Sequence, residues 1–172
     1  TWKAGAVAAC INPLYTEYEM EHALNECGAE TAVVMTRFYN KVKAVQSKTK
    51  VKRVVATSVK EHLSFIMRLL FTLVKEKKAG HRIVLQQGDF WFQDLLKQYK
   101  GSGRPQVTIS PSDNAIILFT GGTTGLSKAA VGSHEALVIS GKQIFAWFQN
   151  ILKEYNEVFL TALPLFHVFA NA

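Results

Sequence analysis

Short apolar runs alternate with helical patterns over the first third of the chain. Residues 4–11, 31–36 and 52–58 are runs of small or β-branched residues, typical of buried strands. Residues 16–28 and 37–49 lie between them and repeat apolar positions at helical spacing. The order strand, helix, strand, helix, strand indicates βαβ units. It therefore predicts a parallel sheet with right-handed crossovers.

Both helices of this region carry local signals. Thr16 precedes the first helix and Glu19 follows three residues later, which is the spacing of a capping box. Gly28 supplies a stop at the C-terminal end of the same helix. The second helix is predicted to bury a face made of Phe38, Val42 and Val45.

The pattern changes over residues 61–100, which are predicted to be mainly helical. Residues 61–78 are apolar on nearly every side, apart from a narrow polar stripe of Ser64, Arg68, Thr72 and Glu76. The apolar part, about twelve residues, is too short to span a bilayer. This helix is either buried or lies on a membrane or partner surface, and the pattern favours neither. Residues 89–99 predict a second, amphipathic helix.

The last third of the chain returns to strands and helices. Residues 113–120 and 128–133 are typical of strands and flank a loop of glycine and threonine. Residues 134–152 predict a long helix, and residues 157–167 a buried strand that ends near a proline. The predicted fold class is α/β, with a largely parallel sheet and a helical insert.

Charge adds one question about partners. The formal net charge is +7, and residues 37–60 hold eight Lys and Arg with no acid. Such a run is either a nucleic-acid patch or the solvated face of a helix. Because few aromatic residues interleave with it, we favour the solvated face and expect no nucleic-acid partner.

Two cysteines and three of the histidines match no known motif. Cys10 and Cys27 have no metal or disulfide spacing, so we expect two reduced thiols in a cytoplasmic protein. Surface positions are predicted for His22, His62 and His81, and core positions for Trp91 and Trp147.

The stretch FTGGTTGLSKAAVGSH, residues 119–134, carries the clearest chemistry. Glycine lets backbone N–H groups approach phosphate oxygens, threonine hydroxyls donate to phosphate or ligate magnesium, and lysine adds positive charge. The candidate phosphate-binding residues are Thr120, Gly121, Gly122, Thr123, Thr124, Gly125, Leu126, Ser127 and Lys128.

Two common nucleotide loops do not fit this stretch. The nucleotide-triphosphatase loop needs Gly before its lysine, whereas Leu126 and Ser127 separate Gly125 from Lys128. That loop also opens a helix, whereas the residues after Lys128 predict a strand. The glycine spacing of dinucleotide-binding folds is absent as well. The sequence therefore predicts a phosphate loop between two strands.

Three motifs, in order along the chain, resemble the adenylate-forming superfamily. The stretch FTGGTTGLSKAAVGSH resembles its phosphate-binding signature, LPLFHVFA resembles its P-x-F-H motif, and KAGAVAACINPLYTEYEMEHALNECGAETAVV resembles the segment before both. The NPLYTEYE form and the helical insert are most similar to bacterial long-chain fatty acid–CoA ligases. This resemblance implies the large N-terminal domain of an acyl-CoA synthetase-like fold.

The resemblance also implies a reaction and roles for residues. A fatty acid would be adenylated by ATP with Mg²⁺, and CoA would then displace AMP. Residues Thr120 to Lys128 would hold the β- and γ-phosphates, with Thr120 as a magnesium contact. Lys128 and His167 are the implied catalytic residues, His167 lying near the carboxylate and the α-phosphate. His134 matches a common family position, and we interpret it as a structural residue at a helix start.

This chain departs from the family pattern in three places, and motifs of the family are missing. Gly121, Ser127 and Ala129 stand where Ser, Pro and Gly are common. The family's downstream adenine, ribose and magnesium motifs and its C-terminal lysine are not in the sequence. We therefore expect an incomplete piece of one AMP-binding domain, inactive alone, with a βαβ segment at 1–60, a helical insert at 61–104 and a phosphate-loop segment at 105–172. A cytoplasmic location is expected, with peripheral contact at the inner membrane face as an alternative. The alternative functions are another acyl or aryl acid ligase of the same superfamily, or a non-catalytic module that binds a membrane surface through residues 37–60 and 63–74.

Overall fold

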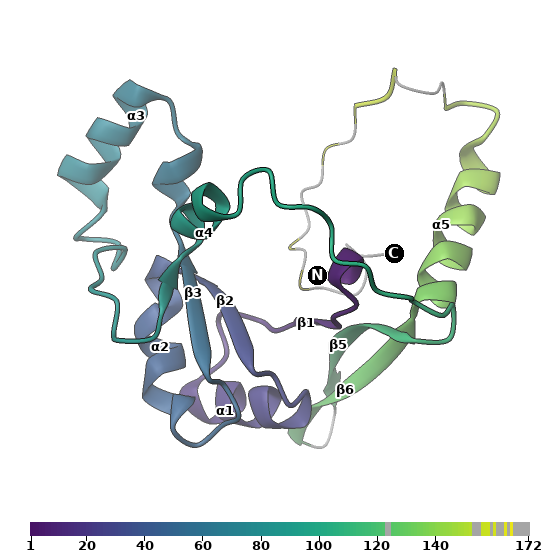
Figure 1. Ribbon diagram of the computed structural model, residues 1–172, viewed down its shortest axis with the longest axis horizontal. Coiled ribbons are helices and arrows are strands. Elements are labelled where there is room, and N and C mark those ends of the chain that lie inside the picture. Colours follow the sequence, from purple (N-terminus) through teal and green to yellow (C-terminus); the bar gives the residue numbers. More distant parts are fainter. Residues whose placement is uncertain (123–124, 153–155, 159, 161–163, 165, 167–172) are drawn as a thin grey trace. The chain divides into compact units, whose positions relative to one another are not determined.

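A computed structural model describes residues 1–122, 125–152, 156–158, 160, 164 and 166 (Figure 1). The chain forms two compact units. The βαβ unit comprises residues 13–103, and the hairpin unit comprises residues 1–12 together with residues from 104 onward. Each unit contains helices and one three-stranded sheet with parallel strand pairs, which confirms the predicted α/β class.

Helix α1 (Glu17–Glu26) begins and ends as its sequence signals predict. The backbone N–H of Thr16 donates to Glu19 Oε2 at 2.8 Å, and the N–H of Glu19 donates to Thr16 Oγ1 at 3.3 Å. This reciprocal pair is a capping box, which satisfies two N–H groups that the first helical turn leaves without partners. Gly28 follows the helix with a φ of 60°, a left-handed conformation that favours glycine.

The sheet of the βαβ unit confirms the predicted parallel pairing and adds an unpredicted strand. Strand β2 (Thr31–Met35) lies parallel to β3 (Arg53–Thr57) in full register. Strand β4 (Phe90–Trp91) extends the sheet on the other side of β3. The predicted helix at 89–99 is therefore wrong at its start, and α4 (Phe92–Gln98) covers the rest. Pairing with β3 takes Phe90 and Trp91 out of the helix, although their spacing suits one.

The core of the βαβ unit lies where α1 and α2 (Thr36–Gln46) pack on each other and α2 packs on the sheet. Its most deeply buried apolar residues are Met20, Ala23, Leu24, Tyr39, Val42, Val45, Val51, Val54, Val55 and Ala56. Phe38 was predicted on the buried face, but it is half-buried, and Tyr39 takes the place with 1% exposure. The Tyr39 hydroxyl has two hydrogen-bond partners inside the unit, which allows this polar atom to be buried.

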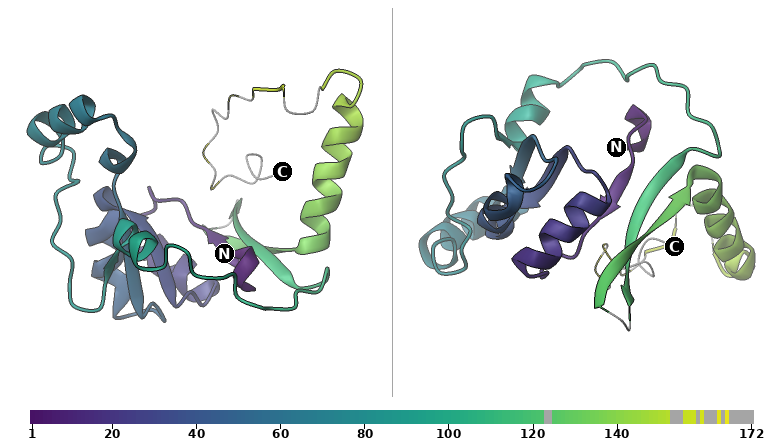
Figure 2. Two further views of the ribbon diagram at one scale, coloured as in Figure 1. Left: turned by 45° about the horizontal axis from the view of Figure 1, so that its top comes forward. Right: turned by 90° about the horizontal axis from the view of Figure 1, so that it is seen from below.

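The apolar insert is not one continuous helix. A 3₁₀-helix (Val59–His62) leads to α3 (Phe65–Leu70), and a π-helix (Phe71–Lys75) continues from it. The N–H of Glu76 donates to the Phe71 carbonyl at 2.8 Å, a bond that spans five residues and so widens the last turn. Figures 1 and 2 show α3 standing away from the sheet of its own unit, so this unit does not bury it. In the part of the chain that the structure describes, no helix is long and apolar enough to cross a bilayer.

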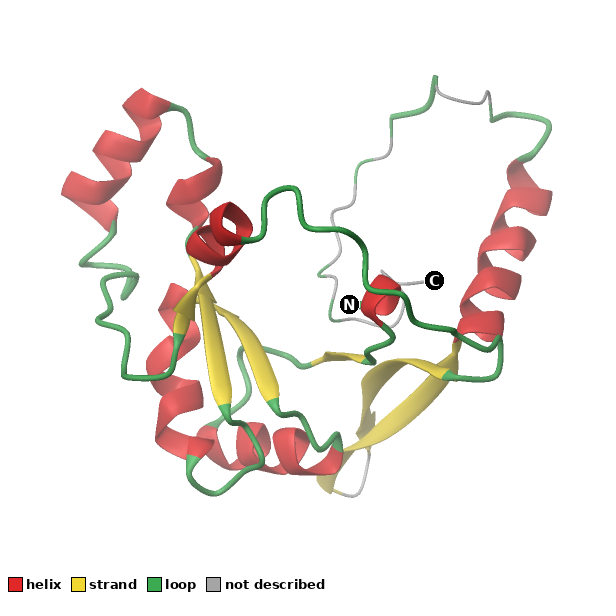
Figure 3. Cartoon of the chain, in the orientation of Figure 1, coloured by secondary structure: helices red, strands yellow, loops and turns green. Residues whose placement is uncertain are grey.

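Two strands flank the glycine and threonine stretch, as predicted, but both extend into the predicted loop, to Gly122 and from Gly125 (Figure 3). Strand β1 (Ala8–Cys10), shorter than the apolar run at 4–11, lies parallel to β5 (Asn114–Gly122). Strand β6 (Gly125–Ser133) returns antiparallel to β5. The buried side chains Ala115 and Ile116 begin β5. The tip of this hairpin therefore projects from strands that are fixed at their other end.

Helix α5 (His134–Phe148) starts directly where β6 ends. The hydroxyl of Ser133 caps it by accepting from the N–H of Ala136 at 3.2 Å, and His134 is its first residue, as expected. Trp147 was predicted in the core but is 85% exposed. Helix α5 contacts β5 and β6 but buries none of its residues, and Trp147 lies in its last turn. The strand predicted at 157–167 lies largely outside the described residues.

Candidate functional site: the β5–β6 hairpin

The predicted phosphate-binding residues that the structure describes lie at the end of the hairpin where β5 leads into β6. Thr120 lies opposite Lys128, and Gly122 lies opposite Gly125. Between these pairs the register shifts, so that Leu126 and Ser127 together face Gly121. Such a β-bulge interrupts the ladder of hydrogen bonds between the strands. At this position the backbone N–H and C=O groups therefore form fewer hydrogen bonds between the strands than in the regular part of the ladder.

Glycine serves different needs along the tip. Gly125 has a φ of 135°, a conformation that side chains with a Cβ rarely adopt. Gly121 shows no positive φ, and a Cβ added there would meet nothing within 4 Å. A hydroxyl-bearing side chain, which is common in the family at this position, would therefore fit at Gly121 without a clash.

Two polar side chains of the tip, Thr120 and Lys128, face solvent. Thr120 is exposed, and its hydroxyl makes a long hydrogen bond of 3.4 Å to the Lys128 carbonyl. Lys128 is also exposed, and no described acid forms an ion pair with it. An exposed ammonium beside glycine backbone suits a polyanion such as a nucleotide phosphate. The predicted residues Thr123, Thr124 and His167 lie outside the described residues.

Three contacts that the sequence did not predict hold the other end of the hairpin. The indole of Trp2 donates to the Ala115 carbonyl at 2.6 Å, and its ring meets the His134 ring edge-on at 6.4 Å. The N–H of His134 donates to the Asp113 carbonyl at 3.1 Å. No local pattern could reveal the Trp2 contact, because 113 residues separate donor from acceptor.

Gly132 also positions the hairpin. A Cβ at this residue would lie 3.0 Å from Ile116 Cγ2, so the absence of a side chain lets β6 approach β5 closely. The signal in the sequence was an isolated glycine inside a predicted strand, which commonly marks a close backbone approach.

A magnesium ion at this hairpin would take most of its ligands from the phosphates of a bound nucleotide and from water. Among the described residues, no group of three or more His, Cys, Asp or Glu side chains could hold a metal. Magnesium sites in nucleotide enzymes usually combine one or two protein oxygens with phosphate oxygens and water. The Thr120 hydroxyl could supply one such protein oxygen.

Cys10 and Cys27 are free thiols whose pKa values are raised by burial, so both stay protonated at neutral pH.

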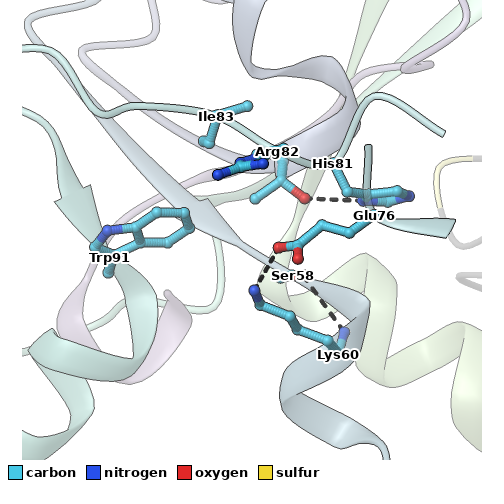
Figure 4. A pocket seen from close by; sticks show the side chains of 8 residues that line it. Ser58, Lys60, Glu76, His81, Arg82, Ile83 and Trp91 are labelled. Atoms are coloured by element: carbon cyan, nitrogen blue, oxygen red, sulfur yellow. Dashed lines mark hydrogen bonds and ion pairs between the residues drawn. The ribbon is translucent and has the colours of Figure 1, made fainter. Parts of the chain in front are cut away.

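A second polar cluster lies in the βαβ unit, around a cavity of about 100 Å³ (Figure 4). The side chains of Lys60 and Glu76 form an ion pair in its wall, and His81 Nδ1 lies 2.9 Å from Thr36 Oγ1. His81 was predicted at the surface but is buried, and the Phe71 ring packs edge-on against it. Burial, and next the charge of Arg37, lower the pKa of His81. These side chains satisfy one another, so we interpret the cluster as an anchor for the insert.

Asp89 is the most buried charged group of the described ion pairs, with a side chain only 2% exposed. Its carboxylate accepts from the Tyr39 hydroxyl at 2.6 Å and from the Val54 N–H at 3.0 Å, and Lys43 Nζ lies 2.8 Å from it. Burial by itself raises the pKa of Asp89, but the bonds from Lys43, Tyr39 and Val54 outweigh it and hold the pKa below its usual value. This network ties α2, β3 and the start of β4 together.

The cationic run at 37–60 is largely bound within the βαβ unit. The ammonium of Lys41 donates to the carbonyls of Pro13 at 3.2 Å and Tyr15 at 2.7 Å. The ion pairs of the run are Lys43–Asp89, Lys48–Glu21, Lys52–Glu30 and Lys60–Glu76. Acids from distant parts of the chain thus compensate charges that look isolated in the sequence.

Comparison with known proteins decides the family. A sequence profile of the AMP-binding enzyme family matches residues 1–172. The chain belongs to the AMP-binding enzyme family. Long-chain fatty acid–CoA ligases of Escherichia coli O157:H7 and Bacillus subtilis are each 32% identical to it, over 98% and 96% of this chain. These AMP-binding relatives confirm the resemblance drawn from the three motifs.

The match covers a limited part of the relatives. The chain spans about 30% of the length of both curated ligases. A crystal structure of a long-chain fatty acid–CoA ligase from Archaeoglobus fulgidus has a TM-score of 0.70 and 24% identity, covering 98% of this AMP-binding chain and 28% of that one. This likeness confirms the predicted acyl-CoA synthetase-like fold.

Proposed function

We propose that this AMP-binding chain contributes the phosphate-binding hairpin of an ATP-dependent long-chain fatty acid–CoA ligase. The observation that carries the proposal is the exposed hairpin tip, where Lys128 has no described acid as partner and Thr120 offers a hydroxyl beside it. Family membership and the two ligase relatives favour this use of the tip over a hairpin that binds nothing.

The reaction joins an anion to a polyanion, so neutralising charge matters more than moving protons. A carboxylate oxygen of the fatty acid attacks the α-phosphorus of ATP, the bond to the β-phosphate breaks, and pyrophosphate leaves. The sulfur of CoA then attacks the acyl carbon, and AMP leaves as the thioester forms. A magnesium ion, when bound, would neutralise further phosphate charge.

Each residue of the hairpin has a distinct part in this proposal. Lys128 binds the β- and γ-phosphates by charge, and the backbone N–H groups around Gly121 and Gly125 donate to their oxygens. The Thr120 hydroxyl donates to phosphate or contacts magnesium. His167 is proposed to act at the carboxylate and the α-phosphate, on the strength of its motif alone. Positioning ATP in this way lowers the entropic cost of the first step.

We test the hairpin in a complete ligase that carries this chain. Replacing Lys128 by Met should lower kcat/KM for ATP by about 10²–10³-fold, the usual cost of losing one charged transition-state contact. Lys142→Met on α5 is the matched control, because Lys142 is also exposed and forms no ion pair with a described acid. Equal values of kcat/KM in the two variants would show that Lys128 does not contribute to the reaction.

Two finer parts of the proposal have their own experiments. The 172 residues alone should release no pyrophosphate from ATP and palmitate, and turnover by them would contradict the idea of an incomplete domain. The complete ligase should prefer long-chain acids in a panel that includes aryl acids. A preference for aryl acids would instead make it another acid ligase of the same family.

A further inference from the structure

One side of the helical insert is held firmly by its own unit. Phe71 packs on the buried His81, with the two ring centroids 5.3 Å apart, and Glu76 is paired with Lys60. The backbone of His81 also donates to the Glu76 carbonyl at 2.8 Å. Figure 4 shows this anchor from close by, with Glu76 between Lys60 and His81. The side of the helix that Phe71 and Glu76 occupy is therefore fixed in place.

The other side of the insert presents large apolar side chains to solvent. Its outer face, defined as Phe65, Ile66, Leu69 and Leu73, has exposed fractions of 83%, 70%, 53% and 74%. Phe65, Ile66 and Leu69 follow the spacing i, i+1 and i+4 within α3, which places them on one side of that helix, and Leu73 follows in the π-helix. Four adjacent apolar side chains with such exposure indicate a contact surface.

Charge around the outer face indicates which partner fits it. Basic side chains without an ion pair to any described acid lie within or directly after this stretch of the chain: Arg68, Lys75, Lys77 and Lys78. The one acid of this stretch, Glu76, is used by Lys60. An apolar face with a cationic border matches the surface of a bilayer that contains anionic lipids.

Helix α5 provides a contrast inside the same chain. It too exposes large apolar side chains, including Phe145 and Trp147. Yet its fifteen residues contain a single lysine, Lys142, and one acid, Glu135. Apolar exposure on α5 therefore gives no reason to choose a lipid partner, whereas the cationic border of the insert does.

We propose that the insert from Phe65 to Lys78 lies flat on an anionic bilayer. The outer face enters the boundary between headgroups and acyl chains, and Lys75, Lys77 and Lys78 bind the headgroups. Eleven helical residues extend about 16 Å, roughly half of a bilayer's apolar core, which agrees with a helix that lies on the membrane instead of crossing it. This proposal does not depend on the identity of the acid that the ligase activates.

The test is co-sedimentation of a complete ligase with vesicles. Vesicles of phosphatidylglycerol with phosphatidylethanolamine should bind it, and vesicles of pure phosphatidylcholine should bind it far less. The double variant Phe65→Ser with Leu73→Ser should lower the partition coefficient at least tenfold, because both side chains lose apolar contact with the lipid. Val84→Ser is the control, since Val84 is 87% exposed but lies outside the face.

A second variant keeps the test informative if the first disturbs folding. Replacing Lys75, Lys77 and Lys78 together by Gln should weaken binding to the anionic vesicles about 100-fold, since each basic residue near the surface contributes about fivefold. Binding to phosphatidylcholine should not change. The proposal would be overturned if the wild-type protein did not bind the anionic vesicles. It would also be overturned if the serine variant bound them as strongly as the wild-type protein does. A fall in the melting temperature of the serine variant, without vesicle binding by the wild type, would show that protein covers the face, which also overturns it.

Discussion

Lys43 and Lys128 show how differently the two units use a lysine. In the βαβ unit, Lys43 is 10% exposed, and its ammonium lies 2.8 Å from the buried carboxylate of Asp89. In the hairpin unit, Lys128 is exposed and has no described acid as partner. The first charge holds the fold together, whereas the second remains available to a ligand.

A dense run of basic residues in a sequence is therefore not by itself evidence of a binding site. The run at 37–60 has the densest basic composition, yet its lysines mostly bind groups of their own unit. Lys128 stands alone between small residues and looks less conspicuous. Local charge density therefore did not indicate the candidate site, whereas the glycine and threonine around Lys128 did.

The largest effect is expected where the internal network is broken. Replacing Asp89 by Ala should lower the free energy of unfolding of the βαβ unit by about 3–5 kcal/mol, since the nearly buried Lys43 would lose its carboxylate and the Val54 N–H its acceptor. Unfolding by denaturant of the variant and the wild-type protein measures this loss. Asp94→Ala is the control, because its ion pair with Lys97 is exposed and should contribute less than about 1 kcal/mol. Equal losses in both variants would contradict a structural role of Asp89.

The comparison itself becomes an experiment when both lysines are replaced by methionine. Lys43→Met should destabilise the protein by about 2–4 kcal/mol, because Asp89 keeps its two other donors but loses its counter-charge. Lys128→Met should change stability by less than about 0.5 kcal/mol, the usual range for an exposed side chain. Thermal unfolding of the two variants decides between the roles, and a marked loss at Lys128 would show that the hairpin also depends on its charge.

His81 belongs to the other polar cluster of the βαβ unit, around Thr36 and Glu76, and makes that cluster sensitive to pH. Its pKa is lowered in the folded protein, chiefly by burial, so the neutral form is favoured there. The unfolded chain binds a proton near the ordinary histidine pKa of about 6.5, which makes stability greatest above that pH and lower as pH falls through the folded pKa. After correction for the slower intrinsic exchange at low pH, the protection factors of the α3 amides should therefore fall as the pH drops below about 6.5. His81→Gln should remove this dependence, and an unchanged dependence would place its origin elsewhere.

Sequence patterns identified what local chemistry determines. The capping box at Thr16, the loop between two strands and the parallel pairing of β2 with β3 were all predicted correctly. The patterns failed where distant partners decide, as for Trp2 with Ala115 and for His81 with Thr36. Strand β4 was missed for the same reason, because its two residues pair with β3. Of the candidate site, residue types were predictable, but the bulge that opens the ladder at Gly121 was not.

Among Asp89, Lys43 and Thr16, the smallest loss is expected at Thr16, whose hydroxyl has an internal partner but lies at the surface. Thr16→Ala removes the acceptor for the Glu19 N–H and should cost about 1 kcal/mol, whereas Thr16→Ser keeps the hydroxyl and should cost much less. Thermal unfolding and hydrogen exchange in the first turn of α1 measure both. If Thr16→Ala lowered the free energy of unfolding as much as Asp89→Ala does, burial of the polar group would not determine the size of the loss. The expected order, with Asp89 first, Lys43 second and Thr16 last, instead follows how far each group is withdrawn from water, since water can replace a lost partner at an exposed site but not in the core.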